Sequence, residues 1–343
     1  MKNVFHDRSS LVVVTGATGH IGNVLVRKLI ERGQHVRALV LPGENLAPLE
    51  GLKVEVVEGN VLDLEGIAPA FEGAESVYHL AGLISIMPGN DLTVRRVNIQ
   101  GTRNIIRLSS QHHVNRLVYT SSIHAFHRMP HGITIDETVP FDVEHPCGVY
   151  DYSKAEASLL VQDAAHLGLD AVIVCPTGVI GPFDFRISDM GRLILDAMTN
   201  RLSFYVDGAY DFIDVRDVAE GLILACEKGR KGESYILSGE QMEVKSILRQ
   251  AQVSAGRRVR IMQIPTRLAR LAARISPIYS RITKTKTRFT TYALETVLCN
   301  SKFSCLKARS ELGFSARPLN TSIADAVDWF MRNQSRLLWA GKT

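Results

Sequence analysis

With 343 residues, 45% of them hydrophobic and 22% charged, the chain has the composition of a globular protein and not of a disordered or collagen-like one. It contains no run of about 18 apolar residues, which excludes a membrane-spanning helix. The net charge of +5 conceals a basic window, Ser254 to Ser310, with thirteen Lys and Arg against one acid, Glu295; this imbalance indicates an anionic partner or a solvated basic face.

Short apolar runs alternate with helical stretches through the first half of the chain, which is typical of a parallel sheet wound with crossover helices. The runs are almost continuously apolar, as expected for strands buried on both faces. The predicted strands are Leu11–Thr15, Val36–Val40, Lys53–Glu58, Ser76–Leu80, Leu117–Ser121 and Ala171–Cys175. The predicted helices are Ile21–Arg32, Asn98–Ser110 and Lys154–Leu167. We therefore predict an α/β fold with a Rossmann-type, doubly wound parallel sheet.

The pattern changes after Gly181-Pro182, where helical segments dominate, interrupted by a strand-like run at Ser234–Leu237. The segment Asp211–Lys228 again reads as a strand followed by a helix. We therefore predict a first domain over residues 1–182, to which residues 211–236 return. A smaller, interleaved and mostly helical lobe is expected over residues 183–210 and 237–343, where it would shape a substrate pocket.

Three glycines lie between the first predicted strand and the first helix, in Thr15-Gly16-Ala17-Thr18-Gly19-His20-Ile21-Gly22. Gly16 permits a tight turn, Gly19 lets the backbone approach a diphosphate, and Gly22 lets the helix pack closely on the strand. The free amides and the dipole of the helix favour the negative charge of a diphosphate. The strand–turn–helix context therefore predicts a dinucleotide-binding site.

Tyr150 and Lys154 are four residues apart in a helical stretch and therefore share one face of a helix. A free tyrosine titrates near ~10, and a lysine cation about 6 Å away is worth roughly 2–3 kcal/mol at an effective dielectric of ~20. We therefore expect Lys154 to lower the pKa of Tyr150 by about two units, which would suit acid/base catalysis near neutral pH. Tyr152 is an internal comparison, because the residue four positions after it is an acid, Glu156.

Together with Ser121-Ser122 at a strand end, these motifs resemble the extended short-chain dehydrogenase/reductase superfamily. Within it, the chain is most similar to the NAD-dependent epimerase/dehydratase family and its dihydroflavonol 4-reductase-like branch. The likeness extends over most of the chain, through His79–Gly82, Val97–Thr102, Cys175–Pro182 and Asp211–Gly221. Asn60 departs from the pattern, because the family usually has an aspartate there.

The resemblance implies hydride transfer between a nicotinamide dinucleotide and a substrate carbon. Tyr150 would be the acid/base, Ser122 would bind the substrate oxygen, and Lys154 would hold the nicotinamide ribose. The implied cofactor contacts are Gly16, Thr18, Gly19, His20, Ile21, Gly22, Asn60, Val61, Leu80, Ala81, Gly82, Asn98, Tyr150, Lys154, Pro176, Thr177 and Val179.

Three functions fit this machinery. The first is an oxidoreductase that interconverts a ketone and a secondary alcohol in a small-molecule substrate. If that substrate carries an anionic group, the basic window would match its charge. The second is a nucleotide-sugar epimerase or dehydratase. The third is a dinucleotide sensor without catalysis, although a sensor has no use for an activated phenol.

The residues at the end of the second predicted strand favour NAD over NADP. Leu41 stands where related reductases have an arginine that binds the 2′-phosphate of NADP. The acidic ligand expected for a free ribose 2′-hydroxyl is missing from this position too. Arg37 is a candidate to replace the missing arginine. Its position inside a strand instead favours a side chain that packs or is solvated.

No metal site is predicted, because the histidines between His112 and His131 lack zinc-site spacing and an acidic partner. His124 or His127 is instead a candidate for substrate contact. The five cysteines include no Cys-x-x-Cys pair, and the polar first ten residues lead directly into a strand. These features predict reduced thiols, no secretory signal and a cytoplasmic location.

In the basic window, Arg267, Arg270 and Arg274 alternate with Leu268 and Leu271, which predicts an amphipathic helix. Residues 257–288 would then lie on an anionic membrane, bind an anionic part of a substrate, or pack by the leucine side as an ordinary helix. Aromatic residues are not interleaved with the arginines, which argues against nucleic acid. The resemblance is also compatible with a homodimer.

Overall fold

The computed structural model describes residues 10–84, 91–200, 202–273 and 291–340, with residues 334–340 described by their backbone alone. The strands are β1 Leu11–Thr15, β2 His35–Val40, β3 Glu55–Glu58, β4 Ser76–His79, β5 Arg116–Thr120, β6 Ala171–Pro176, β7 Gly178–Ile180, β8 Leu202–Tyr205, β9 Ala209–Asp214, β10 Ser234–Leu237, β11 Glu240–Glu243 and β12 Arg260–Gln263. The α-helices are α1 His20–Glu31, α2 Leu64–Ile67, α3 Asp91–Arg95, α4 Gly101–Gln111, α5 Val149–His166, α6 Asp189–Thr199, α7 Val215–Lys228, α8 Val244–Ser254, α10 Thr291–Leu298 and α11 Leu319–Ala340.

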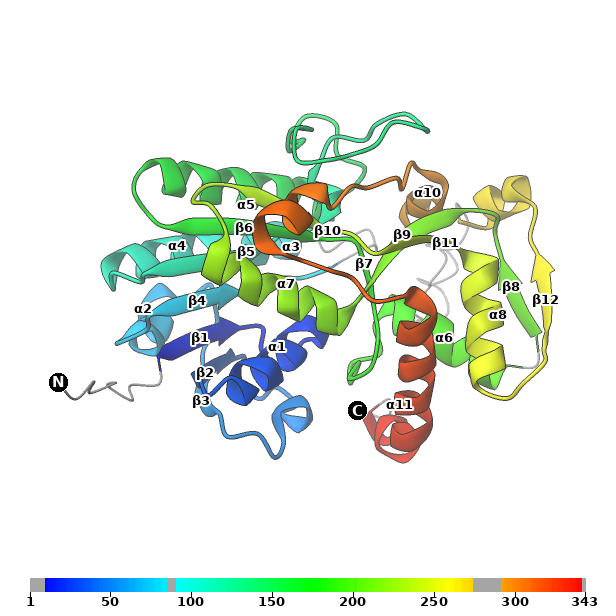
Figure 1. Cartoon of the computed structure of the whole chain (residues 1–343), viewed down its shortest axis with the longest axis horizontal. Coiled ribbons are helices and arrows are strands. Elements are labelled where there is room, and N and C mark those ends of the chain that lie inside the picture. The colour runs from blue at the N-terminus through cyan, green and yellow to red at the C-terminus, as the bar shows by residue number, and fades with distance from the viewer. Residues whose placement is uncertain (1–9, 85–90, 201, 274–290, 341–343) are drawn as a thin grey trace.

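Seven parallel strands form the main sheet, in the order β10-β6-β5-β4-β1-β2-β3 (Figure 1). The predicted fold class is confirmed, and the six predicted strands agree with the observed ones to within two residues. The order reverses between β1 and β4, and the carboxyl ends of these strands form the edge at which such sheets bind ligands.

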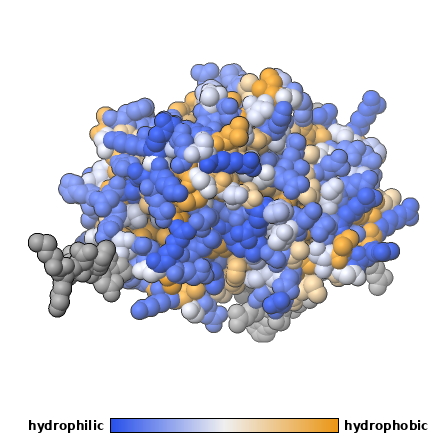
Figure 2. All heavy atoms as spheres, viewed as in Figure 1, coloured by the Kyte–Doolittle hydropathy of each residue, from blue (hydrophilic) through white to orange (hydrophobic). Residues whose placement is uncertain are grey.

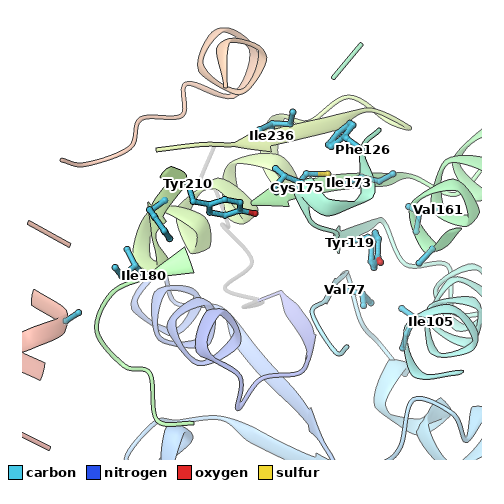
Figure 3. Close-up of a cluster of buried hydrophobic side chains, with 14 of the residues drawn as sticks. Val77, Ile105, Tyr119, Phe126, Val161, Ile173, Cys175, Ile180, Tyr210 and Ile236 are labelled. Atoms are coloured by element: carbon cyan, nitrogen blue, oxygen red, sulfur yellow. The ribbon is translucent and has the colours of Figure 1, made fainter. Parts of the chain in front are cut away.

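Helices cover both faces of this sheet, and each face has its own buried core. On one face α1 packs beside α7, with Val12, Val14 and Leu25 among the buried residues. On the other face α4 and α5 lie over the sheet, and Figure 3 shows Val77, Ile105 and Val161 in their core. Burial on both faces explains why the strands are almost continuously apolar.

One predicted helix has a different start in the structure. It belongs to a longer helical run, in which α3 leads at Arg95 directly into a π-helical turn, Arg96–Gln100, and α4 continues from Gly101. The Thr102 hydroxyl donates a hydrogen bond to the carbonyl of Asn98 at 2.6 Å, within this region. Helix α5 begins at Val149, earlier than the predicted Lys154, so that Tyr150 lies in its first turn.

The second lobe lies beyond the carboxyl edge of the sheet and is built from segments far apart in sequence (Figure 1). It contains the sheets β11-β9-β7 and β12-β8, with α6, α8 and α11 packed together. Segment Asp211–Lys228 is divided between the lobes: its strand residues lie in β9 of the small sheet, and α7 lies against α1 of the first lobe.

Candidate active site

The glycine turn after β1 has the close backbone contacts that the sequence motif requires. Gly16 has a φ of +67°, and a Cβ placed on it would lie 2.8 Å from the amide nitrogen of Ala81. A Cβ on Gly22 would lie 2.1 Å from the Gly16 carbonyl oxygen. Helix α1 follows without a side-chain cap or an acid in its first turn. The turn therefore fits a dinucleotide diphosphate, for which these amides are the natural ligands.

A buried chain of hydrogen bonds connects this turn to the end of β4. The Thr15 hydroxyl accepts from the amide of Ala81 at 3.0 Å and lies 2.8 Å from Nδ1 of His79. Nε2 of His79 lies 3.0 Å from the Thr102 hydroxyl, which in turn donates to Asn98. Because the Thr102 hydroxyl donates its own proton to Asn98, it accepts from the protonated Nε2 of His79. The imidazole is then neutral, and its Nδ1 accepts from the Thr15 hydroxyl. Burial, with a smaller effect from the Lys154 cation, lowers its pKa to about 3.

Lys154 lies at the centre of the carboxyl edge. Its buried Nζ donates to the carbonyl of Thr120 at 2.8 Å. A Cβ on Gly82 would lie 3.6 Å from this Nζ and 3.1 Å from Oδ1 of Asn98, so these residues surround one point. Burial lowers the pKa of Lys154 to about 8. Asn98 also bonds Ser153 at 2.9 Å, which ties the π-helical turn to α5.

Tyr150 is buried beside Ser122 on the same edge. Burial raises its pKa to about 12, and hydrogen bonding with Ser122 opposes this rise only in part. The expectation that Lys154 would lower this pKa by about two units is therefore wrong for the protein alone. The physical reason is desolvation of the phenolate, which outweighs the charge of an ammonium group bound to a backbone carbonyl.

Three further aromatic side chains lie around Tyr150, and only His124 among them was a candidate from sequence. The ring of His124 lies 6.0 Å from that of Tyr150, 6.1 Å from that of Tyr210 and 5.9 Å from that of Tyr292. Nε2 of His124 lies 2.9 Å from the Tyr210 hydroxyl, and Nδ1 lies 3.3 Å from the Tyr292 hydroxyl. Burial lowers the pKa of His124 and keeps the ring neutral. Tyr210 comes from β9, and its hydroxyl points away from Ile180 and toward the side on which Cys175 lies (Figure 3).

Asp151, the residue after Tyr150, anchors this aromatic group. Its carboxylate is almost fully buried and accepts a hydrogen bond from the Tyr292 hydroxyl. Arg128 binds the other carboxylate oxygen at 3.2 Å, and Nδ1 of His124 lies 3.6 Å from the oxygen that accepts from Tyr292. Since Tyr292 belongs to α10, this contact fixes the second lobe against the first turn of α5.

The other predicted cofactor ligands lie along the carboxyl edge or beside it. Leu80 follows β4 directly, and Pro176, Thr177 and Val179 lie where β6 passes into β7. Oδ1 of Asn60 accepts from the amide of Leu62, so its side chain also serves the local turn. Val61 is buried, and its carbonyl accepts from Asn104. The structure brings Ser122, Tyr150 and Lys154 together near the glycine turn.

The loop after Gly181-Pro182 also closes on the glycine turn. Nε2 of His20 lies 2.9 Å from the carbonyl oxygen of Pro182. NH2 of Arg186 donates to the Thr18 hydroxyl at 2.7 Å and pairs with Glu44. The other carboxylate oxygen of Glu44 accepts from the amide of Leu41 at 3.1 Å, so an acid does lie at the end of β2. This acid is not evident from the residues at the strand end, because Glu44 reaches back from three residues after Leu41.

Arg37 is occupied elsewhere. Its guanidinium binds Glu55 on β3 at 2.9 Å and the carbonyls of Ala70 and Glu72 at 2.9 and 3.0 Å. These contacts hold it on the sheet and leave it unsuited to a 2′-phosphate.

Among the described residues, one group has metal-ligand atoms close together: His127, Asp142 and His145. Asp142 already accepts from Nδ1 of His127 at 2.7 Å and from the amides of Glu144 and His145 at 2.9 and 2.8 Å. Hydrogen bonding thus explains the group, and the absence of a metal site stays a prediction.

The profile of the NAD dependent epimerase/dehydratase family matches residues 12–238. The chain belongs to this family. It is 37% identical over 322 residues to sterol demethylase protein B of Methylococcus capsulatus, covering 93% of this chain and 97% of the relative. It is 27% identical over 335 residues to 3-beta-hydroxysteroid dehydrogenase of Mycolicibacterium neoaurum, covering 91% of this chain and 88% of the relative. The crystal structure of gox2253 superposes with a TM-score of 0.83 and 31% identity, covering 94% of this chain and 98% of that one.

Membership in the NAD dependent epimerase/dehydratase family makes the protein an enzyme of the extended short-chain dehydrogenase/reductase type, an oxidoreductase or an epimerase that uses a nicotinamide dinucleotide. The resemblance inferred from the sequence motifs is confirmed, and a sensor without catalysis is disfavoured. None of the described helices is both long and apolar enough to cross a membrane.

Proposed function

We propose that the protein is an NAD-dependent oxidoreductase that interconverts a ketone and a secondary alcohol on a lipophilic, alicyclic substrate. The observation that supports this most directly is the meeting of Ser122, Tyr150 and Lys154 at the carboxyl edge. There, Nζ of Lys154 lies close to Gly82, and Ala81 lies against Gly16 of the glycine turn. A phenol, a hydroxyl and an ammonium thus stand beside the predicted dinucleotide site.

Each side chain has a separate task in this proposal. A dinucleotide held at the glycine turn would supply or accept the hydride. Tyr150 is a neutral phenol at pH 7, since a free tyrosine titrates near ~10 and burial raises the pKa of Tyr150 further, to about 12; it donates its proton to the carbonyl oxygen of the substrate. Ser122 orients that oxygen with a second hydrogen bond. Lys154 would hold the nicotinamide ribose and would add positive charge near the reacting oxygen.

The substrate class rests on the relatives and on the surroundings of Tyr150. Two relatives that match over most of their length are named for sterol or steroid chemistry. Around Tyr150, the rings of His124, Tyr210 and Tyr292 offer flat apolar faces with polar tips. Such side chains suit a rigid ring system that has few oxygens. A nucleotide sugar would need more polar and charged partners.

Glu44 supports the choice of NAD over NADP. The adenosine ribose of a bound dinucleotide lies near the end of β2 in this fold, where an acid binds a free 2′-hydroxyl. Glu44 is held there by the amide of Leu41. A second negative charge on a 2′-phosphate would be repelled by this carboxylate, although Arg186 beside it would reduce the repulsion.

The test compares Tyr150→Phe with Tyr152→Phe in the same helix. A panel of 3-ketosteroids, 3-hydroxysteroids and nucleotide sugars is first screened with the wild type by NADH absorbance. We expect turnover of a steroid, a loss of at least about a hundredfold in Tyr150→Phe, and near wild-type turnover in Tyr152→Phe. Both variants should still bind NADH in titration calorimetry.

The proposal fails if Tyr150→Phe keeps wild-type turnover. Conversion of a nucleotide sugar without net change in NADH would instead identify an epimerase.

A further inference from the structure

The helix in the basic window packs in the opposite way to an ordinary amphipathic helix. Residues 266–273 are helical, and Ala269 and Ala273 are fully buried against Val206 and Leu294. Leu268 is 59% exposed and Leu271 is 56% exposed. Packing by the leucine side, one of the alternatives from sequence, is therefore wrong for these residues. Residues 274–288 of the predicted 257–288 segment lie outside the described residues.

A two-stranded sheet beside this helix exposes apolar residues in the same way. Phe204 on β8 and Met262 on β12 are register partners and so lie on one face of the β8–β12 pair. Phe204 is 54% exposed and Met262 is 40% exposed. The chain passes from β12 at Gln263 directly into the helix at Thr266, so the two elements adjoin at the end of the second lobe (Figure 1).

Arginines lie among these apolar residues. Arg258, Arg260, Arg267 and Arg270 are all exposed. Only Arg270 pairs with a carboxylate in the described part of the chain, Glu295 at 3.5 Å. In Figure 2, hydrophilic and apolar side chains lie next to one another over this right-hand end of the molecule. We call Phe204, Arg260, Met262, Arg267, Leu268 and Leu271 the distal surface.

We propose that the distal surface docks on an anionic lipid bilayer. Exposed leucine, methionine and phenylalanine can enter the boundary between headgroups and acyl chains, while arginines bind the lipid phosphates. A second copy of the chain is a poorer occupant, because it would bring the same arginines against one another. Nucleic acid does not account for the exposed leucines. The inference goes beyond the proposed function and does not depend on it, although a lipophilic substrate would be found in such a bilayer.

The experiment is co-sedimentation of the full chain with vesicles of phosphatidylglycerol and phosphatidylcholine, or of phosphatidylcholine alone. We expect binding to the anionic vesicles at 50 mM NaCl and release at 500 mM NaCl, since screening weakens surface charge interactions over this range. Near an anionic surface each arginine strengthens binding by about fivefold. Arg260→Gln with Arg267→Gln should therefore weaken binding by about twenty-five-fold.

Matched control variants test whether vesicle binding depends on the distal surface or on arginines and leucines exposed anywhere on the protein. Arg103→Gln with Arg107→Gln changes two exposed arginines of α4, at the opposite end of the molecule, and should leave vesicle binding unchanged. Leu268→Ser with Leu271→Ser should weaken binding at least about tenfold. Leu167→Ser with Leu306→Ser, which changes two leucines exposed elsewhere, should not.

Three results would overturn the proposal. One is no sedimentation with the anionic vesicles at 50 mM NaCl. Another is equal loss of binding in the distal and control variants. The third is a dimer in gel filtration that Leu268→Ser with Leu271→Ser dissociates, without vesicle binding, which would make the surface a contact between two copies. Circular dichroism of each variant confirms that it is folded.

Discussion

Lowering the pH from 7 to 5 should destabilise this protein through His79. The imidazole is fully buried between Thr15 and Thr102, and burial lowers its pKa to about 3, whereas an unfolded chain protonates it near 6.5. Between these two values the unfolded state binds more protons, so stability falls as the pH decreases from about 6.5 towards 3. For one site with these two pKa values, the loss between pH 7 and pH 5 is about 2 kcal/mol.

Urea denaturation at pH 7 and pH 5 measures this effect in the wild type and in His79→Asn. The variant will be less stable at both pH values, because it loses a buried hydrogen bond. The informative quantity is the change in unfolding free energy between the two pH values, to which other histidines contribute equally in both proteins. We expect this change to be about 2 kcal/mol smaller in the variant. Equal changes would refute the view that His79 is held neutral.

Three further variants test contacts of the predicted dinucleotide site and of the aromatic group around Tyr150. Glu44→Gln should strengthen NADP binding relative to NAD by about tenfold in calorimetric titrations, because it removes a negative charge near the ribose 2′-position. Gly22→Ala should abolish detectable dinucleotide binding and lower the unfolding free energy by more than about 2 kcal/mol, because its Cβ would lie 2.1 Å from a carbonyl oxygen. Tyr292→Phe should cost about 1–3 kcal/mol in urea denaturation, because the buried Asp151 loses a donor, and should raise KM more than it lowers kcat.

The main sheet was predictable because its signals are local. Strands buried on both faces need continuous apolar runs, and Leu11–Thr15 and Ala171–Pro176 show this plainly in sequence. The glycine turn was equally readable, because three glycines at fixed spacing have one common structural explanation. The π-helical turn at Arg96–Gln100 was not predictable, since its hydrogen-bond shift leaves the apolar pattern almost unchanged.

The residues that complete the candidate site were hidden for a different reason. Tyr210 and Tyr292 lie 60 and 142 positions after Tyr150 in the sequence, and no motif connects them. Arg186 and Glu44 meet only because the loop after Pro182 folds back over α1. Such contacts follow from the packing of the two lobes, which the local pattern does not specify. Asp151 stands beside Tyr150 in the sequence, but nothing in the local pattern connects it with Tyr292 or Arg128.

The pKa of Tyr150 shows why identifying a residue is not the same as knowing its charge. The pattern Tyr150–Lys154 correctly places both side chains on α5, yet Lys154 directs its Nζ to the Thr120 carbonyl and leaves the phenol desolvated. With a pKa of about 12 in the free protein, Tyr150 is protonated at neutral pH but is a weak acid, so donation of its proton to a ketone oxygen would be faster if the bound cofactor lowered this pKa. Alcohol oxidation needs the phenolate, whose formation requires more positive charge than Lys154 supplies. Since an oxidised nicotinamide ring is itself cationic, we expect the pKa of Tyr150 to be lower in the NAD complex than in the free protein, as ultraviolet difference titration of tyrosinate would show.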